Sequence, residues 1–570
     1  MRNLLKIFIL IVVPYLLKNE AQSQIQLKKF TILNFTTPIR SFPLQVFDIC
    51  QAGQGKILYY QIVINQIRCL GFIWLDQFSN VVVHKVYADP YGRDIYCTRL
   101  MPTSNNSYSV ALAAVRSPTT SPDHPLVITL DNSSGNLLSC EELTNAPGYY
   151  QESAFIPTDI VRKGNKYKIL ATGATPVCYD FDPATNIYSY TIYTDSDINR
   201  PQPIQLVDAH FVKSYHNSEA LLTGDVTFFG ILHEWDNANL ITDRAFVYKE
   251  AGNTTGVYYD LGLNNSNISA IHINGEDAGP TYNIALQNQA NLYVFESNNN
   301  LSTVNWTRFY SPSSNVTVGL YPENNHGTKA GFAGGVSPSV DYFPSRIVQP
   351  FTGPGYIRVD LNNGNLLNAN YYDLNIANHL LDFMRSYTYD PNMDFTAIAG
   401  CATVMNNTDQ SFYYMVDNSL TPSTCPTSIN FTETSGSFTK TPRTLLRTAS
   451  PTYTSVAVPL SSVTPNPITV QNLCFDVGGR ISNSSVLTTE KTDNSELKII
   501  PTNAQLNIQS EKNIIAVNVF NNIGQLIHQE KNIKTKNIKT KKLNHGLEKI
   551  VIVELFFSDQ TSITRKIILL

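Results

Sequence analysis

The stretch VITLDNSSGN, residues 127–136, runs from an apolar strand-like segment into a polar turn that starts at an acidic residue and contains a glycine. Asp and Asn favour such turns because their side chains accept backbone hydrogen bonds, while Gly accepts a positive φ. Versions of this stretch begin at residues 72, 127, 178, 232, 292, 356 and 413. Their acidic residues, spaced 51 to 64 positions apart, are Asp76, Asp131, Asp182, Asp236, Glu296, Asp360 and Asp417.

A second recurring segment, rich in small residues, precedes most of these acidic turns. Examples are YKILATG ending at Gly173, EALLTG ending at Gly224 and AGFAGG ending at Gly335. Small residues in a strand allow neighbouring backbones to approach closely, as they must near the axis of a radial assembly. Each unit is therefore typical of a four-stranded blade, and the fold class expected for residues 24–480 is an all-β propeller with seven blades. A series of β-sandwiches is the main alternative.

Composition favours an extracellular protein. Only 15% of the 570 residues are charged, against roughly 25% in ordinary soluble domains, and 31 residues are Tyr. Residues 24–496 contain 27 Lys and Arg against 39 Asp and Glu, a net charge of −12, whereas residues 497–570 contain 11 against 5, a net charge of +6. An acidic body argues against nucleic acid as a partner, because phosphate binding needs clustered cations.

The first 23 residues are typical of a secretory signal peptide. Arg2 and Lys6 precede the apolar run IFILIVVPYLL, and Ala21-Gln22-Ser23 has the small-x-small pattern of a cleavage site. The run is too short for a bilayer-spanning helix of about 20 residues, although a retained anchor is the alternative. Eight cysteines without a C-x-x-C pair permit disulfides in an exported protein without fixing their pairing; a Cys401–Cys425 bridge is favoured because both lie in one unit.

A tether at residues 481–496 leads into a separate β module at residues 497–570. The module contains the strand-turn-strand VNVFNNIGQLI at 517–527 and the terminal strand TRKIIL. It resembles the type A C-terminal sorting domain of proteins exported by the type IX secretion system, and we therefore expect a small β-sandwich. The residues that match the motif are Pro501, Asn503, Gly524 and Gly546. An ordinary accessory β-sandwich is the alternative.

The resemblance implies a bacterial protein that is exported through the periplasm and across the outer membrane by the type IX secretion machinery. It also implies a terminal module that is commonly removed, with the cargo either released or attached to outer-membrane lipopolysaccharide. The expected location is therefore the cell surface or the medium.

The sequence contains no strong catalytic motif: it has no G-x-S-x-G, no H-E-x-x-H and no phosphate-binding loop. For His210 and His216 a surface or hydrogen-bonded role is expected rather than metal ligation. No cofactor is expected. The turn DLNNGN at 360–365 resembles a short calcium loop, but capping of a hairpin by Asp and Asn fits the varied residues of the repeated turns better, so calcium is kept as the alternative.

Two long interruptions, at residues 116–125 and 336–355, are candidates for ligand-binding loops because long insertions in a regular ring are often functional. From the second we select Asp341, Tyr342, Phe343 and Arg346 as ligand contacts; a packing flap over the channel mouth is the alternative. We expect a recognition protein that binds an extracellular glycan or protein. The alternative is an extracellular hydrolase or lyase acting on polysaccharide, since propellers host both functions.

Overall fold

The computed structural model describes most strands of the chain and the tight turns between them. The described residues are 27–35, 45–52, 55–76, 80–101, 107–116, 123–144, 156–172, 176–195, 205–212, 214–216, 219–236, 239–250, 255–260, 270–274, 280–288, 291–312, 317–318, 329–333, 339–343, 347–349, 351–353, 355–360, 362–372, 379–390, 395–404, 410–417, 426–428, 431–436, 439–443, 445–465, 467–477, 497–502, 505–521, 526–541, 550–558 and 562–568. The signal-peptide prediction and the tether lie outside these residues.

The chain divides into two compact units. One is the body, Gln26–Ser484, and the other contains Ser485–Leu570, so the division falls within the tether expected at 481–496. All regular elements of the described residues are strands. Among these residues, no helix has the length and apolar character needed to cross a bilayer.

The body contains seven antiparallel sheets, counted over the described residues, that each take four strands in radial order. The first blade consists of β2 (Gln45–Ala52), β3 (Gly55–Ile64), β4 (Ile67–Leu75) and β5 (Val81–Ala88). The second consists of β6 (Asp94–Met101), β7 (Tyr108–Arg116), β8 (His124–Asp131) and β9 (Leu137–Glu142). The third blade consists of β10 (Ile156–Lys163), β11 (Lys166–Thr172), β12 (Val177–Asp182) and β13 (Ile187–Asp195). The fourth consists of β14 (Gln205–Phe211), β17 (Thr227–Asp236), β18 (Asn239–Lys249) and β19 (Thr255–Asp260). The fifth blade consists of β20 (Ala270–Asn274), β21 (Thr281–Asn288), β22 (Asn291–Asn298) and β23 (Val304–Pro312). The sixth consists of β25 (Lys329–Ala333), β26 (Ser339–Phe343), β29 (Gly355–Asp360) and β30 (Leu366–Tyr372). The seventh combines β31 (His379–Asp390), β32 (Phe395–Val404) and β33 (Gln410–Asp417) with the N-terminal β1 (Leu27–Phe35).

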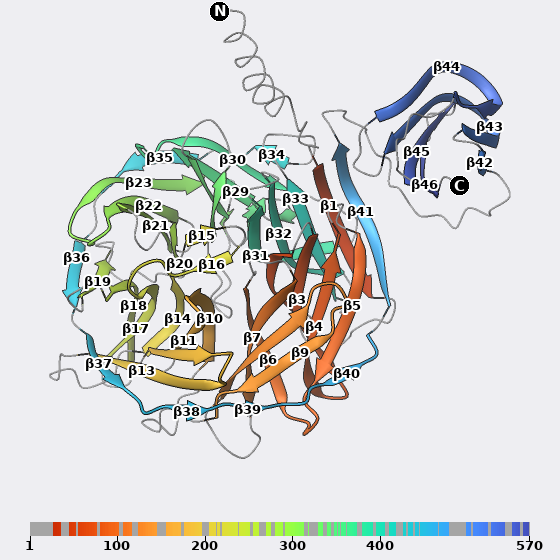
Figure 1. The fold of residues 1–570 in the computed structure, drawn as a ribbon. Helices are drawn as coiled ribbons and strands as arrows, with labels where there is room; N and C mark the ends of the chain where they lie inside the picture. Colours follow the sequence, from red (N-terminus) through yellow and green to blue (C-terminus); the bar gives the residue numbers. More distant parts are fainter. Residues whose placement is uncertain are drawn as a thin grey trace, which may run out of the picture. The chain divides into compact units, whose positions relative to one another are not determined.

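These blades form a closed ring, as Figure 1 shows. The first strand of each blade is the innermost of its four strands. It contacts the first strand of the next blade, except between the fourth and fifth blades, where β17 contacts β20, and β31 of the seventh blade contacts β2 of the first. The all-β propeller expected from the sequence is therefore confirmed, and a series of β-sandwiches does not describe the body. Because β1 supplies the fourth strand of the seventh blade, the two ends of the propeller sequence are joined in one sheet.

A circumferential belt, residues 426–477, adds a fifth strand to every blade. Its strands are β34 (Pro426–Ser428), β35 (Phe431–Ser435), β36 (Thr439–Arg443), β37 (Leu445–Ala449), β38 (Tyr453–Thr454), β39 (Val456–Ala457), β40 (Ser461–Val463) and β41 (Ile468–Val477). β34, β35 and β36 pair with the sixth, fifth and fourth blades, and β37 and β38 both pair with the third. β39 pairs with the second blade, β40 with the first and β41 with the seventh. After the seventh blade's third strand, the chain thus travels once round the ring, against the order of the blades, and returns to pair with β1 (Figure 1).

The acidic turns follow the third strand in six blades, and the fourth blade differs. Asp236 ends β17, the second strand, and pairs with Asn239 across the turn to β18. The residue that follows the third strand there is Glu250, so the unit assigned to Asp236 was shifted by one hairpin. The cause is a pair of short strands, β15 (Ser214–His216) and β16 (Glu219–Leu221), inserted between the first two strands of this blade. The EALLTG segment belongs to that insertion, and AGFAGG supplies the innermost β25.

The acidic turns have the chemistry that their sequence predicts. Oδ1 of Asp131 accepts the backbone N–H of Ser133 at 2.7 Å, and Gly135, at φ +69°, donates its N–H to the Asp131 carbonyl at 2.8 Å. A Cβ on Gly135 would lie 2.8 Å from Val83 of the neighbouring blade, and the hydroxyl of Tyr87 in that blade donates to the Gly135 carbonyl at 2.6 Å. The turn is therefore both a hairpin cap and a contact between blades.

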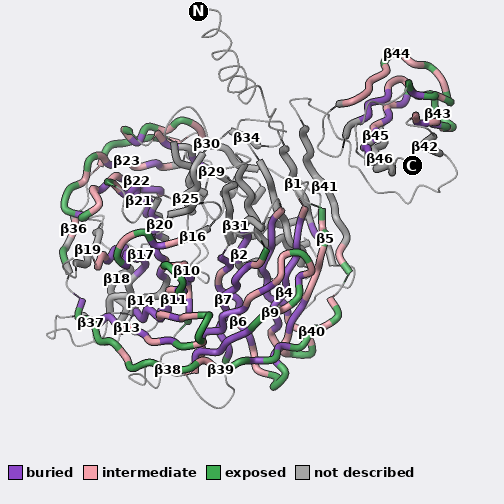
Figure 2. Tube along the Cα trace, viewed as in Figure 1, coloured by how far each residue is buried: buried purple, intermediate pink, exposed green. Residues whose placement is uncertain are grey.

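The described inner strands of the blades are largely buried (Figure 2), and large aromatic side chains belong to this buried core. The fully buried side chains of largest volume are all tyrosines: Tyr59, Tyr60, Tyr179, Tyr188, Tyr193, Tyr248, Tyr282 and Tyr310. The hydroxyl of a buried tyrosine usually has a hydrogen-bond partner, and that of Tyr59 donates to the carbonyl of Leu112 in the second blade at 3.1 Å. The high Tyr content is thus used in the core. Five buried cysteines, Cys50, Cys69, Cys97, Cys140 and Cys178, are free thiols, and the Cys401–Cys425 expectation lies outside the described side chains.

The C-terminal unit is one strongly bent five-stranded sheet in its described residues. Its strands are β42 (Leu497–Thr502), β43 (Gln505–Asn521), β44 (Leu526–Lys539), β45 (Ile550–Phe557) and β46 (Ser562–Ile568). The long β43 pairs with β42 at its start and with β45 from Ile514 onward. Its pairing with β44 shifts register between Gln509 and Ile514. Both halves contribute to a separate apolar core that includes Leu506, Val517, Val553 and Phe557.

Candidate functional site

Three of the four residues predicted to contact a ligand lie on a strand of the sixth blade. Asp341, Tyr342 and Phe343 lie on β26, where they pair with β25 and β29 as part of the sixth blade. Residues further along the same stretch form β27 (Ile347–Gln349) and β28 (Phe351–Gly353), which join β24 (Thr317–Val318) in a three-stranded sheet. Arg346 lies outside the described residues. Ligand contact by this segment stays a prediction.

The innermost strands of the first four blades share a β-bulge that brings charged residues to equivalent positions. The register shifts between Val46 and Asp48, Cys97 and Arg99, Pro157 and Asp159, and Leu206 and Asp208. In each case one residue is skipped, and the next residue resumes the ladder. A bulge bends its strand and redirects its side chains. The sequence of the propeller thus places Asp, Arg, Asp and Asp in corresponding positions on four successive inner strands.

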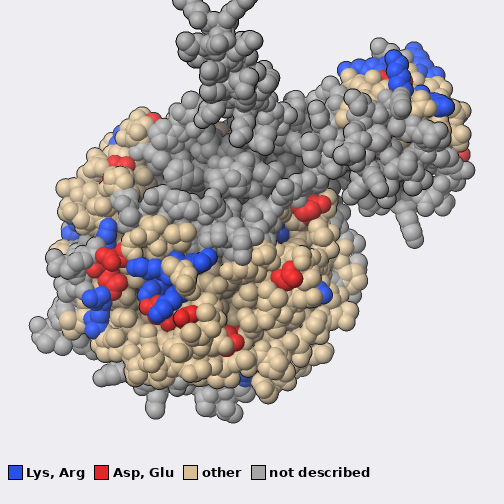
Figure 3. All heavy atoms as spheres, viewed as in Figure 1, with Lys and Arg blue, Asp and Glu red and all other residues tan. Residues whose placement is uncertain are grey.

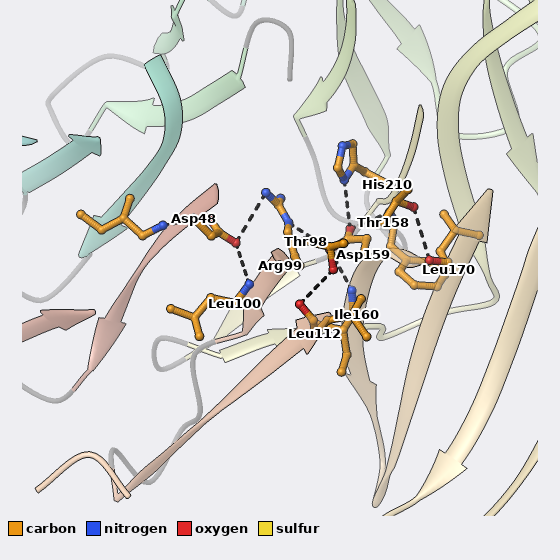
Figure 4. Close-up of polar contacts among 12 residues, drawn as sticks. Asp48, Thr98, Arg99, Leu100, Leu112, Thr158, Asp159, Ile160, Leu170 and His210 are labelled. Atoms are coloured by element: carbon orange, nitrogen blue, oxygen red, sulfur yellow. Dashed lines mark hydrogen bonds and ion pairs between the residues drawn. The ribbon is translucent and has the colours of Figure 1, made fainter. Parts of the chain in front are cut away.

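Arg99 of the second blade bridges the carboxylates of its two neighbouring blades, as Figure 4 shows. Its Nε lies 3.2 Å from Oδ1 of Asp159 in the third blade, and its Nη1 lies 3.7 Å from Oδ2 of Asp48 in the first. The Asp159 side chain is fully buried, and that of Asp48 is 5% exposed. Attraction between buried charges is screened little by salt, so one guanidinium holds three blades together near the axis.

Backbone amides also donate to both carboxylates. Asp48 accepts the N–H of Ile49 at 3.0 Å and, from the next blade, that of Leu100 at 2.8 Å. Asp159 accepts the N–H of Ile160 at 3.0 Å and, again from the next blade, that of Phe211 at 3.0 Å. Hydrogen bonds of this kind stabilise the ionised form of a carboxyl. These two carboxylates are therefore committed to holding neighbouring strands.

In two of the four blades, the residue skipped by the bulge is a threonine. Thr98 and Thr158, the residues skipped in the ladders of the second and third blades, direct their hydroxyls to backbone carbonyls on the adjoining strand. Thr98 donates to Leu112 at 2.9 Å, and Thr158 donates to Leu170 at 3.3 Å (Figure 4). In these two blades the threonine hydroxyl therefore ties the skipped residue to the adjoining strand.

His210 of the fourth blade lies beside the Asp159 carboxylate of the third blade. Its Nδ1 lies 3.7 Å from Oδ2 of Asp159, and its ring is tilted against Phe229 at a centroid distance of 5.8 Å. Its side chain is 12% exposed. The network consists of Asp48, Arg99, Asp159 and His210, and we call it the axial network. Of these residues, sequence reasoning considered only His210; the recurrence of Asp within the apolar stretches VFDIC, PTDIV and LVDAH was the missed signal.

A second ionic cluster lies where the first blade leads into the second. Arg93 forms an ion pair with Asp89 at 2.9 Å and with Glu142 at 3.0 Å, and Nδ1 of His124 lies 2.8 Å from the same Glu142. Burial would raise the pKa of the Glu142 carboxyl, but hydrogen bonds and charge from His124 and Arg93 outweigh this effect and lower the pKa. Like the axial network, the cluster links blades through carboxylates that already have partners.

Two features of the chain bear on metal binding: clusters of His, Cys, Asp and Glu side chains, and the turn at residues 360–365. Over the described residues, no group of three or more His, Cys, Asp or Glu side chains converges. In the 360–365 turn, Oδ1 of Asp360 accepts the N–H of Asn362 at 2.8 Å, and Oδ1 of Asn363 accepts that of Asn365 at 2.8 Å. These bonds match hairpin capping. Calcium in this turn stays an untested prediction.

Of the residues matched to the sorting-domain motif, Pro501 lies on β42 opposite Leu506. Asn503, Gly524 and Gly546 lie outside the described residues. The motif is therefore placed only at its first position.

Comparison with known proteins gives a family match in the C-terminal unit. Residues 487–569 match a family described as a domain of unknown function, DUF8694. No curated protein matches the chain. A solved structure titled as the propeller of Dos1 is similar over 67% of this chain and 94% of its own, at 8% sequence identity and a TM-score of 0.33.

Proposed function

We propose that this chain is a secreted or cell-surface bacterial recognition protein, exported by the type IX secretion system, whose propeller binds an extracellular glycan or protein. The observation that carries the recognition half is the state of the axial carboxylates. Asp48 and Asp159 are buried, paired with Arg99 and bonded to backbone amides. A general acid or nucleophile must be able to exchange protons or attack, and these carboxylates serve as structural ties between blades instead.

Export is supported by the construction of the C-terminal unit. It has an apolar core of its own and a positive charge opposite to that of the body. Its β43–β44 pairing includes the segment that resembles the sorting domain. A self-contained terminal module is suited to recognition by export machinery and to later removal. Attachment of the body to outer-membrane lipopolysaccharide is part of the same proposal.

The export half is tested by deleting residues 487–570 and locating the body in periplasmic, surface and culture fractions. We expect the truncated body to accumulate in the periplasm. As a matched experiment, residues 1–26 and 478–570 placed around an unrelated reporter should carry that reporter out of the cell. Undiminished export of the truncated body would refute the sorting role of the module.

The recognition half is tested on purified protein with panels of immobilised glycans and matrix proteins, and in parallel with soluble polysaccharides assayed for new reducing ends and unsaturated products. Saturable binding without turnover is expected. Turnover of any polysaccharide would instead establish the hydrolase or lyase.

A further inference from the structure

The hairpin that joins β10 to β11 concentrates positive charge on an otherwise acidic body. Its sequence RKGNKYK contains Arg162, Lys163, Lys166 and Lys168 within seven residues. We call these four residues the basic hairpin. Figure 3 shows Lys and Arg gathered over the part of this face where Figure 1 labels β10, β11 and β16. Residues 24–496 carry a net charge of −12, so this cluster runs against the charge of its surroundings.

The lysines of the hairpin lie on one face of the sheet. Lys163 and Lys166 are direct cross-strand partners, and Lys168 lies two residues beyond Lys166 on the same strand. Directly opposed side chains project to the same side, as do alternate residues of one strand. The three lysines are thus attached to the backbone at positions about 5 to 8 Å apart. The turn between them is open, because a Cβ on Gly164 would meet nothing within 4 Å.

Two of these charges lack a carboxylate partner. Lys168 is paired with Asp180 on β12. Lys163 donates instead to the backbone carbonyl of Gly224 at 2.7 Å, and among the described residues no acidic group forms an ion pair with Lys163 or with the exposed Lys166. Like charges placed directly opposite each other destabilise a hairpin. The direct opposition of Lys163 and Lys166 is therefore unfavourable for the hairpin itself, and an anionic ligand bridging the two amines would relieve the repulsion.

The inserted β15–β16 hairpin gives the cluster a fixed position. β16 adds to the inner edge of β10 through the Arg162↔Leu221 pair, and Leu222 donates its N–H to the Arg162 carbonyl at 2.8 Å. Lys163 is anchored to the same segment through Gly224. Charges that are held in place before binding lose less conformational entropy when the ligand arrives.

We propose that the basic hairpin binds an anionic polysaccharide, a polymer with about one carboxylate or sulfate per sugar. The inference rests on the proposed role of the body in recognition. Nucleic acid is a poorer match because it carries one charge per ~1.7 Å of duplex, a density that the surrounding acidic surface would repel. The aromatic residue of the hairpin, Tyr167, is buried, so the hairpin offers no platform on which bases could stack.

The test uses the chain without its predicted signal peptide, residues 24–570, and three probes: polygalacturonate, neutral dextran and a single-stranded oligonucleotide of matched length. Binding is measured by biolayer interferometry at 50 and 200 mM NaCl. We expect polygalacturonate to bind at 50 mM salt, to bind more weakly at 200 mM, and to exceed both other probes. Lys166→Gln should weaken binding about threefold and Lys166→Glu about tenfold, whereas Lys166→Arg should leave it unchanged.

The matched control is Lys541→Glu, which makes the same charge change at an exposed residue of the C-terminal unit. Thermal unfolding of each variant verifies that the fold is intact. The inference is overturned by absence of polygalacturonate binding at 50 mM salt, by equal losses in Lys166→Glu and Lys541→Glu, or by an oligonucleotide that binds as tightly as the polysaccharide. Failure here leaves the export experiment untouched, because Lys166 lies outside the deleted module.

Discussion

Replacing Val458 and Leu460 by alanine removes the two belt side chains that are buried against the first two blades. Val458 is 5% exposed and Leu460 8%, and both belong to the apolar cluster that the two blades share. Truncation of a buried Leu costs about 2 to 5 kcal/mol, and the smaller Val costs less. Because both side chains contact one cluster, their effects need not add, and we expect the double variant to lose about 3 to 5 kcal/mol of unfolding free energy.

Val456→Ala is the matched control, since this residue lies on the same belt but is 49% exposed. A surface change of this kind should stay within about 0.5 kcal/mol. The assay is urea unfolding followed by tryptophan fluorescence, where the double variant should lower the midpoint by on the order of 1 M. Equal midpoints for the double variant and Val456→Ala would refute the view that the belt is an integral fifth layer of the blades.

Three further outcomes follow from the described contacts. Gly135→Ala combines a positive φ with a 2.8 Å contact to Val83, so it should cost about 2 to 4 kcal/mol in urea unfolding, whereas Gly164→Ala, with positive φ in open space, should cost about 1 to 2; equal losses would remove the steric explanation. Arg99→Met leaves two buried carboxylates without their cation and should cost about 3 to 5 kcal/mol, and a loss below about 1 would show that the axial network contributes little. Burial lowers the pKa of His84 to about 4 from 6.5, so the neutral side chain contributes fully to the unfolding free energy above pH 6.5, and this contribution is lost as the pH falls towards 4. Because the side chain is partly exposed to solvent, the loss amounts to at most about 2 kcal/mol. His84→Gln should therefore flatten the plot of unfolding free energy against pH between 6.5 and 4.

The blade architecture was predictable because it depends on short-range chemistry that repeats. Asp131 caps its own turn through Ser133, and Gly135 supplies the positive φ, so the motif can be read wherever it recurs. The same reasoning placed the fourth unit wrongly. Asp236 ends an apolar strand just as the other acidic residues do, and nothing local distinguishes a turn between the second and third strands from one between the third and fourth.

The belt and the axial network were not predictable in this way. Belt strands such as β38 and β39 contain two residues each, too few to show alternation, and they are defined by partners hundreds of positions away. The axial network depends on register. Asp48 and Arg99 come to equivalent positions only because a bulge in each inner strand skips one residue, and a sequence pattern does not reveal a bulge before the strand pairing is known.

The belt also explains how the body could tolerate the loss of both segments proposed as export signals. Leu27, four residues after the predicted cleavage position, pairs with Val477, after which the tether to the C-terminal unit begins. The two proposed processing points therefore flank neighbouring strands of one blade, and every strand of the ring lies between them. Because β1 is itself held between β33 and β41, removal of either segment takes away no ladder hydrogen bond and no core side chain of the described propeller. A ring closed by strands from both ends of its own sequence is thus compatible with detachable signals at both ends, and the wrapping of the belt makes the closed body independent of either signal.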